Sequence, residues 1–175
     1  VFMLVGAGSN ITIQIGDEGV LVVDTGLGQI SDKVLGAIRQ LSDKPVRLVI
    51  NTHVHRDHTG GNEDFAKVGK GLGGNAPGNF VPVFPGARII AHENTRLWLG
   101  TDIDSKWEKR TYTRLPKDAR PTQTFYTTGS LAFGGEILDY GYLPQAHTDG
   151  DIHVLFRNAY LLVAGDVVQL PSYPV

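Results

Sequence analysis

The sequence contains no cysteine, and this absence removes several kinds of chemistry at once. Disulfides, thiolate metal ligands and cysteine nucleophiles are all excluded, so any metal ion must be held by histidine and carboxylate side chains. A chain without cysteine tolerates both oxidising and reducing surroundings. Because the first residue is Val1 and not Met, a cytoplasmic location and export after removal of a signal peptide both stay open.

The sequence also lacks long apolar runs and basic clusters. No apolar stretch approaches the roughly 18 residues that a membrane-spanning helix needs. Sixteen Lys and Arg residues stand against 18 Asp and Glu residues, for a formal net charge of −2. A charge spread in this way does not neutralise a phosphate backbone. We therefore expect no membrane and no nucleic acid as partners, and a length of 175 residues without repeats or linkers predicts a single domain over 1–175.

The patterns that are present alternate between strand and helix. Three apolar runs separated by glycines, at 2–5, 10–15 and 20–23, predict an antiparallel meander. Apolar residues recur at helical spacing over 30–41, where Ser31 or Asp32 is the expected N-cap. Further strands are predicted at 46–50, 88–91, 123–127, 131–133, 136–143, 152–156 and 160–164, and helices at 60–68 and 93–99. Predicted strands and helices thus alternate along the chain.

Two other stretches are less regular. The polar stretch 101–121 is interpreted as holding a short helix. Five glycines within 69–78 predict a mobile loop, because glycine loses much backbone entropy on ordering.

Three imidazoles and a carboxylate fall within six positions, at His53, His55, Asp57 and His58. They follow the predicted strand 46–50, and loops at strand ends are where sites are built. His53 and His55 lie two apart, which places their rings on one side to hold one ion, while Asp57 and His58 turn towards a second. Neutral imidazole and carboxylate suit zinc, and iron or manganese also remain open.

Two separate additions are needed to finish such a site. His147 lies in Ala-His-Thr-Asp-Gly-Asp, and Asp166 lies in Ala-Gly-Asp-Val after an apolar run. Each follows a predicted strand. His92 and His153 are interpreted instead as a helix cap or strand-face residues, and Trp98 and Trp107 as packing residues, either of which could border a substrate pocket.

The run from His53 to His58 resembles the His-x-His-x-Asp-His signature of the metallo-β-lactamase superfamily. The strand that ends in Asp24-Thr25-Gly26 is also similar to that family, as are His147 and Asp166. The resemblance implies an α/β fold of the four-layer αβ/βα metallo-β-lactamase sandwich type. It also implies a first ion on His53, His55 and His147, a second on Asp57, His58 and Asp166 with Asp166 shared, and Asp24 as a partner that orients a ligand.

Three departures from the family pattern refine this expectation. Asp166 stands where the commonest zinc β-lactamases carry cysteine, which favours lactonase, thioesterase and broader hydrolase branches. His55 replaces the glutamate of the flavodiiron branch, which favours hydrolysis over oxygen reduction. The family's final histidine has no counterpart before Val175, so the fold is expected to be C-terminally incomplete and the second ion to lack one ligand.

The function predicted is that of a metal-dependent, zinc hydrolase acting on a small molecule. A metal-held water loses its proton near pH 7 instead of about 15.7. Asp57 would orient this hydroxide and accept a proton, and the bond cleaved would be an ester, thioester, lactone or amide. Two alternatives stay open: a mononuclear iron oxidoreductase similar to persulfide dioxygenases, and a metal-binding domain without turnover.

Overall fold

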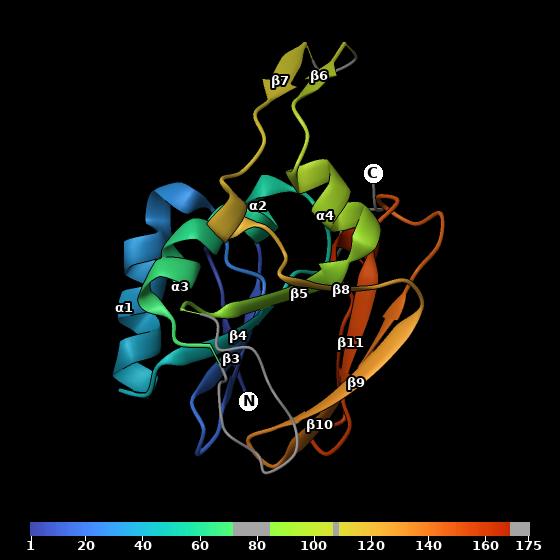
Figure 1. Cartoon of the computed structure of the whole chain (residues 1–175). Helices are drawn as coiled ribbons and strands as arrows, with labels where there is room; N and C mark the ends of the chain where they lie inside the picture. Colours follow the sequence, from blue (N-terminus) through green and yellow to red (C-terminus); the bar gives the residue numbers. More distant parts are fainter. Residues whose placement is uncertain (72–84, 107–108, 169–175) are drawn as a thin grey trace.

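A six-stranded sheet with the order β1-β2-β3-β4-β5-β8 forms the centre of the fold (Figure 1). The computed structural model describes residues 1–71, 85–106 and 109–168. The strands are β1 (Phe2–Leu4), β2 (Ile11–Ile15), β3 (Val20–Val23), β4 (Val46–Ile50), β5 (Arg88–His92) and β8 (Gln123–Phe125). The first three strands pair antiparallel, as the meander pattern predicts. From β3 to β8 the pairing is parallel, so the carboxyl ends of four strands meet at one edge.

A second, antiparallel sheet packs against the first. Its order is β12-β11-β10-β9, and its strands are β9 (Thr128–Phe133), β10 (Glu136–Tyr142), β11 (Ile152–Phe156) and β12 (Leu161–Val163). The remaining strands, β6 (Ile103–Ser105) and β7 (Arg110–Tyr112), form a separate two-stranded hairpin that projects from one end of the molecule (Figure 1).

The burial of β3 explains its continuous apolar sequence. Val20 and Val22 face a core that the helices complete, whereas Leu21 and Val23 face a core shared with the second sheet. A strand that is covered on both faces needs apolar residues at every position, not an alternation. The second sheet has one covered face, and its strand β11 accordingly alternates between buried and partly exposed positions.

Helices α1 (Ser31–Leu41) and α3 (Asn62–Val68) cover the other face of the six-stranded sheet. The span of α1 agrees with the helical pattern, but the predicted cap was wrong. The N-cap is Ile30, without a side-chain hydrogen bond. A 3₁₀ turn, Gly28–Ile30, leads directly into the helix, and the Ser31 hydroxyl donates to the Gly28 carbonyl within that turn. The Ser31 side chain thus bonds back to the preceding 3₁₀ turn, whereas a capping side chain would accept from an amide in the first turn of α1.

The helix expected at 60–68 is α3, which begins at Asn62. A further short helix that the pattern did not predict, α2 (Arg56–Thr59), precedes it across Gly60 and Gly61. A Cβ on Gly60 would lie 2.5 Å from both the Arg56 carbonyl oxygen and the Gly28 nitrogen, so the chain approaches itself too closely there for a side chain. The helix expected within 101–121 is mainly the β6–β7 hairpin, followed by a single 3₁₀ turn at Lys117–Ala119. Helix α4 (Glu93–Leu99) lies where the pattern places it.

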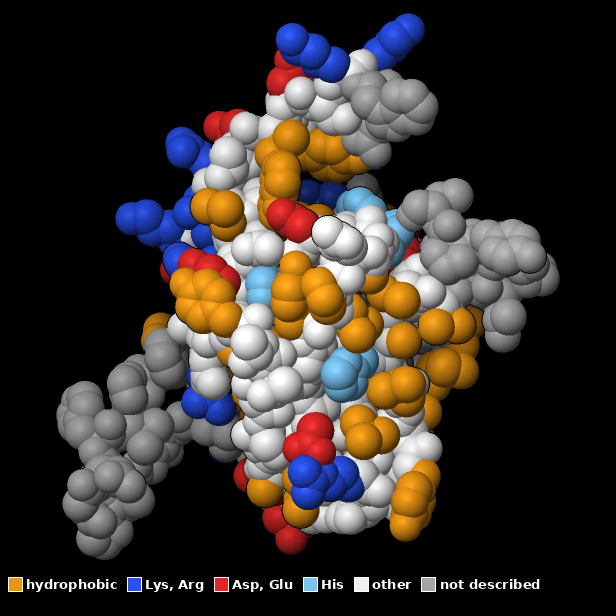
Figure 2. All heavy atoms as spheres, turned by 90° about the vertical axis from the view of Figure 1, so that its right-hand side faces the viewer, with side chains coloured by type: hydrophobic (Ala, Val, Ile, Leu, Met, Phe, Trp, Pro, Cys, Tyr) orange, Lys and Arg blue, Asp and Glu red, His pale blue; other side chains and the backbone are white. Residues whose placement is uncertain are grey.

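The α/β fold class and its sandwich arrangement are confirmed. The described residues supply a helical layer, the six-stranded sheet and the four-stranded sheet, and they place no helix on the outer face of the latter (Figure 1). Hydrophobic side chains gather on that outer side (Figure 2). Its exposed large hydrophobic residues include Ile137 and Leu162. Among the described residues, no helix has both the length and the apolar character needed to cross a membrane.

Adjacent residues of β10 test the packing between the sheets. Leu138 is fully buried between them, and Ile137 is 39% exposed on the opposite face. We expect Leu138→Ala to lower the free energy of unfolding by about 2–5 kcal/mol, because it leaves a cavity in the shared core. Ile137→Ala should cost about 1 kcal/mol or less. Urea unfolding of both variants measures the difference, and equal losses would contradict the described facing of β10.

Candidate metal centre

The centre lies beyond the carboxyl ends of the parallel strands β3 and β4, which is where open α/β sheets commonly build sites. The Asp24 amide, just after β3, donates to the Ile50 carbonyl at the end of β4 at 2.8 Å. The chain then runs through the loop 51–55 into α2. This loop carries His53 and His55, and the first turns of α2 carry Asp57 and His58.

The second sheet contributes two more side chains. His147 lies in the loop between β10 and β11, and Asp166 lies in a 3₁₀ turn, Gly165–Val167, directly after β12. The packing of the two sheets therefore brings both residues to the cluster from the far end of the chain. All six predicted ligands lie around one region of the molecule.

Three imidazoles converge in the first group. The His53 Nε2 atom lies 3.1 Å from His55 Nδ1, and the His147 Nε2 atom lies 2.9 Å from the same His55 atom. Ligand atoms of these three residues all lie within 4.8 Å of one another. This is the set that the resemblance assigns to the first ion.

The second group joins His53, His58 and Asp166, whose ligand atoms also lie within 4.8 Å of one another. Asp166 Oδ1 is 3.1 Å from His58 Nε2, and its Oδ2 is 3.8 Å from His147 Nε2 and 4.0 Å from His53 Nε2. One carboxylate thus faces both groups, as a shared ligand must.

Asp57 lies at the rim of the second group. Its Oδ2 atom is 3.7 Å from His58 Nε2, and its side chain is 38% exposed, far more than those of the neighbouring histidines. The structure therefore places His53, and not Asp57, in one group with His58 and Asp166. The role of Asp57 as a ligand and proton acceptor stays a prediction.

Asp24 is buried behind the cluster and accepts three hydrogen bonds. The donors are the Thr52 amide at 2.8 Å, the Thr52 hydroxyl at 2.7 Å and His58 Nδ1 at 2.7 Å. A carboxylate that holds one ring nitrogen of a histidine fixes the ring and directs its other nitrogen towards the ligand position. The contact is the one expected of the orienting role predicted for Asp24.

Thr52 is a residue that motif reasoning missed. Its hydroxyl donates to the Asp24 carboxylate and lies 3.1 Å from His53 Nδ1. Because a hydroxyl has one proton to give, it accepts from His53, which puts the imidazole proton on Nδ1 and leaves Nε2 with a lone pair. The sequence feature that could have identified Thr52 is a hydroxyl side chain directly before the first histidine.

The pKa values of the two histidines His53 and His58 are shifted in opposite directions. Burial, together with the His58 and His55 rings, lowers the pKa of His53 to about 2, so this imidazole is neutral at pH 7. Burial would also lower the pKa of His58, but the Asp24 and Asp166 carboxylates outweigh it and raise that pKa to about 10. The contact with His58, opposed by burial, lowers the pKa of Asp166 to about 2.

The donor set fits a divalent transition metal. Imidazoles in their unprotonated form and carboxylates are ligands that zinc, iron and manganese accept. His53 already has this form, and His58 would give up its proton on binding a cation. Several nitrogen atoms that converge at 2.9–3.1 Å with a carboxylate beside them form a site that a cation would fill. The chemistry of these residues does not select one of the three metals.

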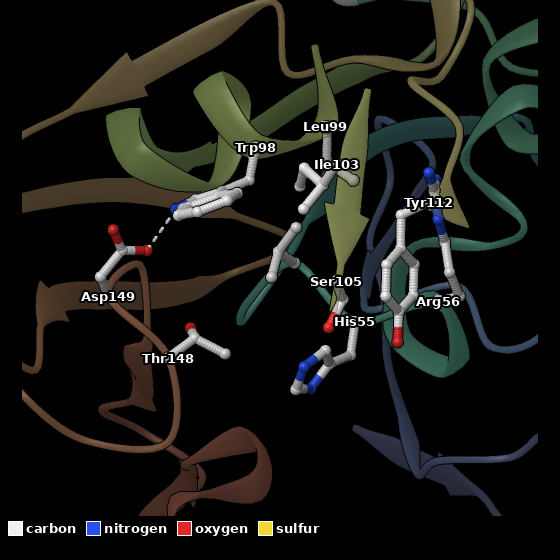
Figure 3. Close-up of a pocket in the computed structure, with 10 residues that line it drawn as sticks. His55, Arg56, Trp98, Leu99, Ile103, Ser105, Tyr112, Thr148 and Asp149 are labelled. Carbon is white, nitrogen blue, oxygen red and sulfur yellow. Dashed lines mark hydrogen bonds between the residues drawn. The ribbon is translucent and has the colours of Figure 1, made fainter. Parts of the chain in front are cut away.

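The remaining candidates fall outside the cluster. His92 is the N-cap of α4, where its Nδ1 accepts from the Asn94 amide, and His153 lies on β11. Trp98 borders a cavity beside His55 (Figure 3). Trp107 and most of the glycine-rich stretch 69–78 lie outside the described residues.

Comparison with known proteins agrees with this geometry. The sequence profile of the metallo-beta-lactamase superfamily matches residues 4–174. The chain therefore belongs to that superfamily. A 49-residue stretch of the chain is 45% identical to a linear primary-alkylsulfatase of Pseudomonas sp. (strain ATCC 19151). This stretch is 27% of this chain and 9% of the sulfatase.

Solved structures show the same fold. A metallo-beta-lactamase from Pontibacter korlensis is 22% identical, with a TM-score of 0.61 over 88% of this chain and 58% of that one. A subclass B3 enzyme from a soil metagenome library is 20% identical, with a TM-score of 0.65 over 86% and 52%. A subclass B3 enzyme of Bradyrhizobium japonicum is 20% identical, with a TM-score of 0.63 over 85% and 50%. The chain thus spans little more than half the length of these structures and a small part of the sulfatase.

Replacing the Asp24 carboxylate tests whether it orients the cluster. We expect Asp24→Asn to weaken zinc binding about 10–100-fold, the usual cost of losing such a partner of a metal-bound histidine. Calorimetric titration of metal-free protein gives the affinity. Glu136→Gln is the matched control, because Glu136 is an equally buried carboxylate that instead accepts from the Asn158 and Ala159 amides. Equal affinity losses in both variants would show a general effect of unfolding.

Proposed function

We propose that this chain carries the reactive centre of a zinc-dependent hydrolase with two metal positions. The proposal rests on one observation: side chains from the loop after β4, from α2 and from the second sheet converge in two groups that share one histidine. They are His53, His55, His147, His58 and Asp166. Membership of the metallo-beta-lactamase superfamily supports it. His53, His55 and His147 would hold one ion, and Asp57, His58 and Asp166 the other, with Asp166 facing both.

A bound divalent cation would polarise the scissile carbonyl and lower the pKa of a coordinated water from about 15.7 to about 7. The chain's own residues do the rest. The partly exposed Asp57 carboxylate lies on the open side of the cluster, where it can accept a proton and orient the attacking oxygen. Asp24 and Thr52 hold the His58 and His53 rings still, so that little reorganisation accompanies the reaction.

The bond cleaved is proposed to be an ester, thioester, lactone or amide of a small molecule. The local likeness to a linear primary-alkylsulfatase adds sulfate esters to the substrates worth testing. None of the thiolate chemistry of cysteine enters, since the chain has no cysteine.

Metal analysis and a substrate panel test the proposal together. Purified protein should contain zinc and hydrolyse at least one of p-nitrophenyl acetate, a thioester, a lactone, nitrocefin and an alkyl sulfate. Bound iron with oxygen-dependent turnover of a persulfide would favour the dioxygenase-like alternative. Tight zinc binding without turnover of any substrate would leave a metal-binding domain.

The ligand assignment predicts a further contrast. His147→Ala should lower zinc affinity and kcat/KM by more than about 100-fold, because it removes a ligand and not merely the partner of one. His153→Ala is the matched control, since this histidine lies on β11 outside the cluster, and it should stay within about twofold of wild type. Similar losses in both variants would contradict the assignment of His147.

A further inference from the structure

A cavity of about 500 Å³ opens beside His55. Trp98, Leu99 and Ile103 lie along one side of it, Tyr112 lies opposite, and Thr148 and Asp149 close a third side (Figure 3). The surface of this cavity is mainly apolar although it adjoins a cluster of histidines. A concave apolar pocket with a few polar groups at one end is the usual form of a small-molecule site.

Helix α4 fixes one wall of the cavity to the loop that carries His147. Trp98 Nε1 donates to Asp149 Oδ1 at 2.6 Å, and the Asn94 side chain donates to the Asp149 carbonyl at 2.7 Å. The Thr95 hydroxyl donates to the Gly150 carbonyl at 3.0 Å. The wall is therefore preformed and keeps a fixed relation to the cluster.

The bond to Asp149 also determines which part of Trp98 faces a ligand. The indole nitrogen is satisfied, and what stays accessible is mainly the apolar ring, since the residue is 38% exposed. An aromatic ring held rigid in this way offers large contact area at low entropic cost.

The β6–β7 hairpin supplies two further residues of the cavity lining. Ile103 and Tyr112 are directly paired across its two strands, so both side chains reach the same cavity from one rigid ladder. The Arg110 guanidinium lies 4.8 Å from the centre of the Tyr112 ring, which further fixes that ring. Two separate elements, α4 and the hairpin, thus present apolar surface to one space beside His55.

We propose that this cavity binds the hydrophobic part of the substrate, an alkyl group attached to the acyl side of the bond that is cleaved at the cluster. Trp98 and Ile103 are the residues that determine this specificity. The inference rests on the proposed hydrolase function, because it places the scissile bond beside His55 and the hydrophobic group against Trp98.

Chain length is the variable that tests it. Zinc-loaded protein should hydrolyse p-nitrophenyl hexanoate with a kcat/KM about tenfold or more above that for p-nitrophenyl acetate, since each methylene placed in an apolar pocket adds to binding. Binding can also be measured without catalysis. Calorimetry should show that the protein binds hexanoate more tightly than acetate by about tenfold or more.

Two variants locate the effect. Ile103→Trp fills the cavity from the hairpin, and it should lower the kcat/KM for hexanoate far more than the kcat/KM for acetate, so that the preference is lost while the zinc content stays at the wild-type level. Trp98→Ala should also lower the hexanoate preference, and Trp98→Phe should restore most of it. Leu97→Ala is the matched control, because Leu97 is the neighbouring residue on α4, is 63% exposed and does not line the cavity.

The outcomes separate this inference from the function on which it rests. Hydrolysis without chain-length preference, or equal losses for acetate and hexanoate in Ile103→Trp with zinc retained, would overturn the assignment of the cavity and leave the hydrolase standing. Preferential binding of hexanoate that Ile103→Trp abolishes, in a protein that hydrolyses no substrate of the panel named above, would keep the cavity and overturn the hydrolase.

Discussion

The geometry of the centre depends on the carboxylate of Asp24. This residue ends β3 with a φ of 65°, in the left-handed region that a residue other than glycine enters at a cost. Three hydrogen bonds from Thr52 and His58 offset that cost. They tie the end of β3 to the loop after β4 and to α2. The parallel pairing of β3 and β4 is therefore what sets the spacing between the buried carboxylate and the imidazoles.

The second sheet is fixed to the same loop. The Ile152 amide at the start of β11 donates to the Thr52 carbonyl at 2.9 Å. Gly165 lies against Thr52 so closely that a Cβ would be 2.9 Å from the Thr52 hydroxyl, and its φ of 55° also favours glycine. The glycine before Asp166 thus allows that carboxylate to approach His58. Thr52 is the point at which the two halves of the cluster meet.

Much of this was predictable because it is written in short, local patterns. The dense run from His53 to His58 and the apolar run of β3 each depend on neighbouring residues. The residues that hold the histidine rings in place were harder to predict. Thr52 acquires its role only through Asp24, which is 28 positions away along the chain. The same limit explains why sequence could not show that His53, and not Asp57, shares one group with His58 and Asp166: that choice depends on how the sheets pack.

The errors in the middle of the chain have a related cause. The hairpin of β6 and β7 has three residues in each strand, too few for an alternation to be distinguished from a polar loop. Yet this hairpin supplies Ile103 and Tyr112 to the cavity. The residues that would select a substrate therefore lie where the sequence pattern is weakest, whereas the residues that would hold metal lie where it is strongest.

Helix α4 connects the cavity wall to the loop that carries His147. Asp149 accepts from Trp98 in the cavity wall and lies two residues from His147 in the same loop. A substitution that enlarges the cavity by moving α4 would also strain the hydrogen bonds to Asp149 and Gly150, and hence the position of the His147 ring. The hydrogen bonds from α4 to Asp149 and Gly150 therefore hold one wall of the cavity in a fixed relation to the loop that carries His147.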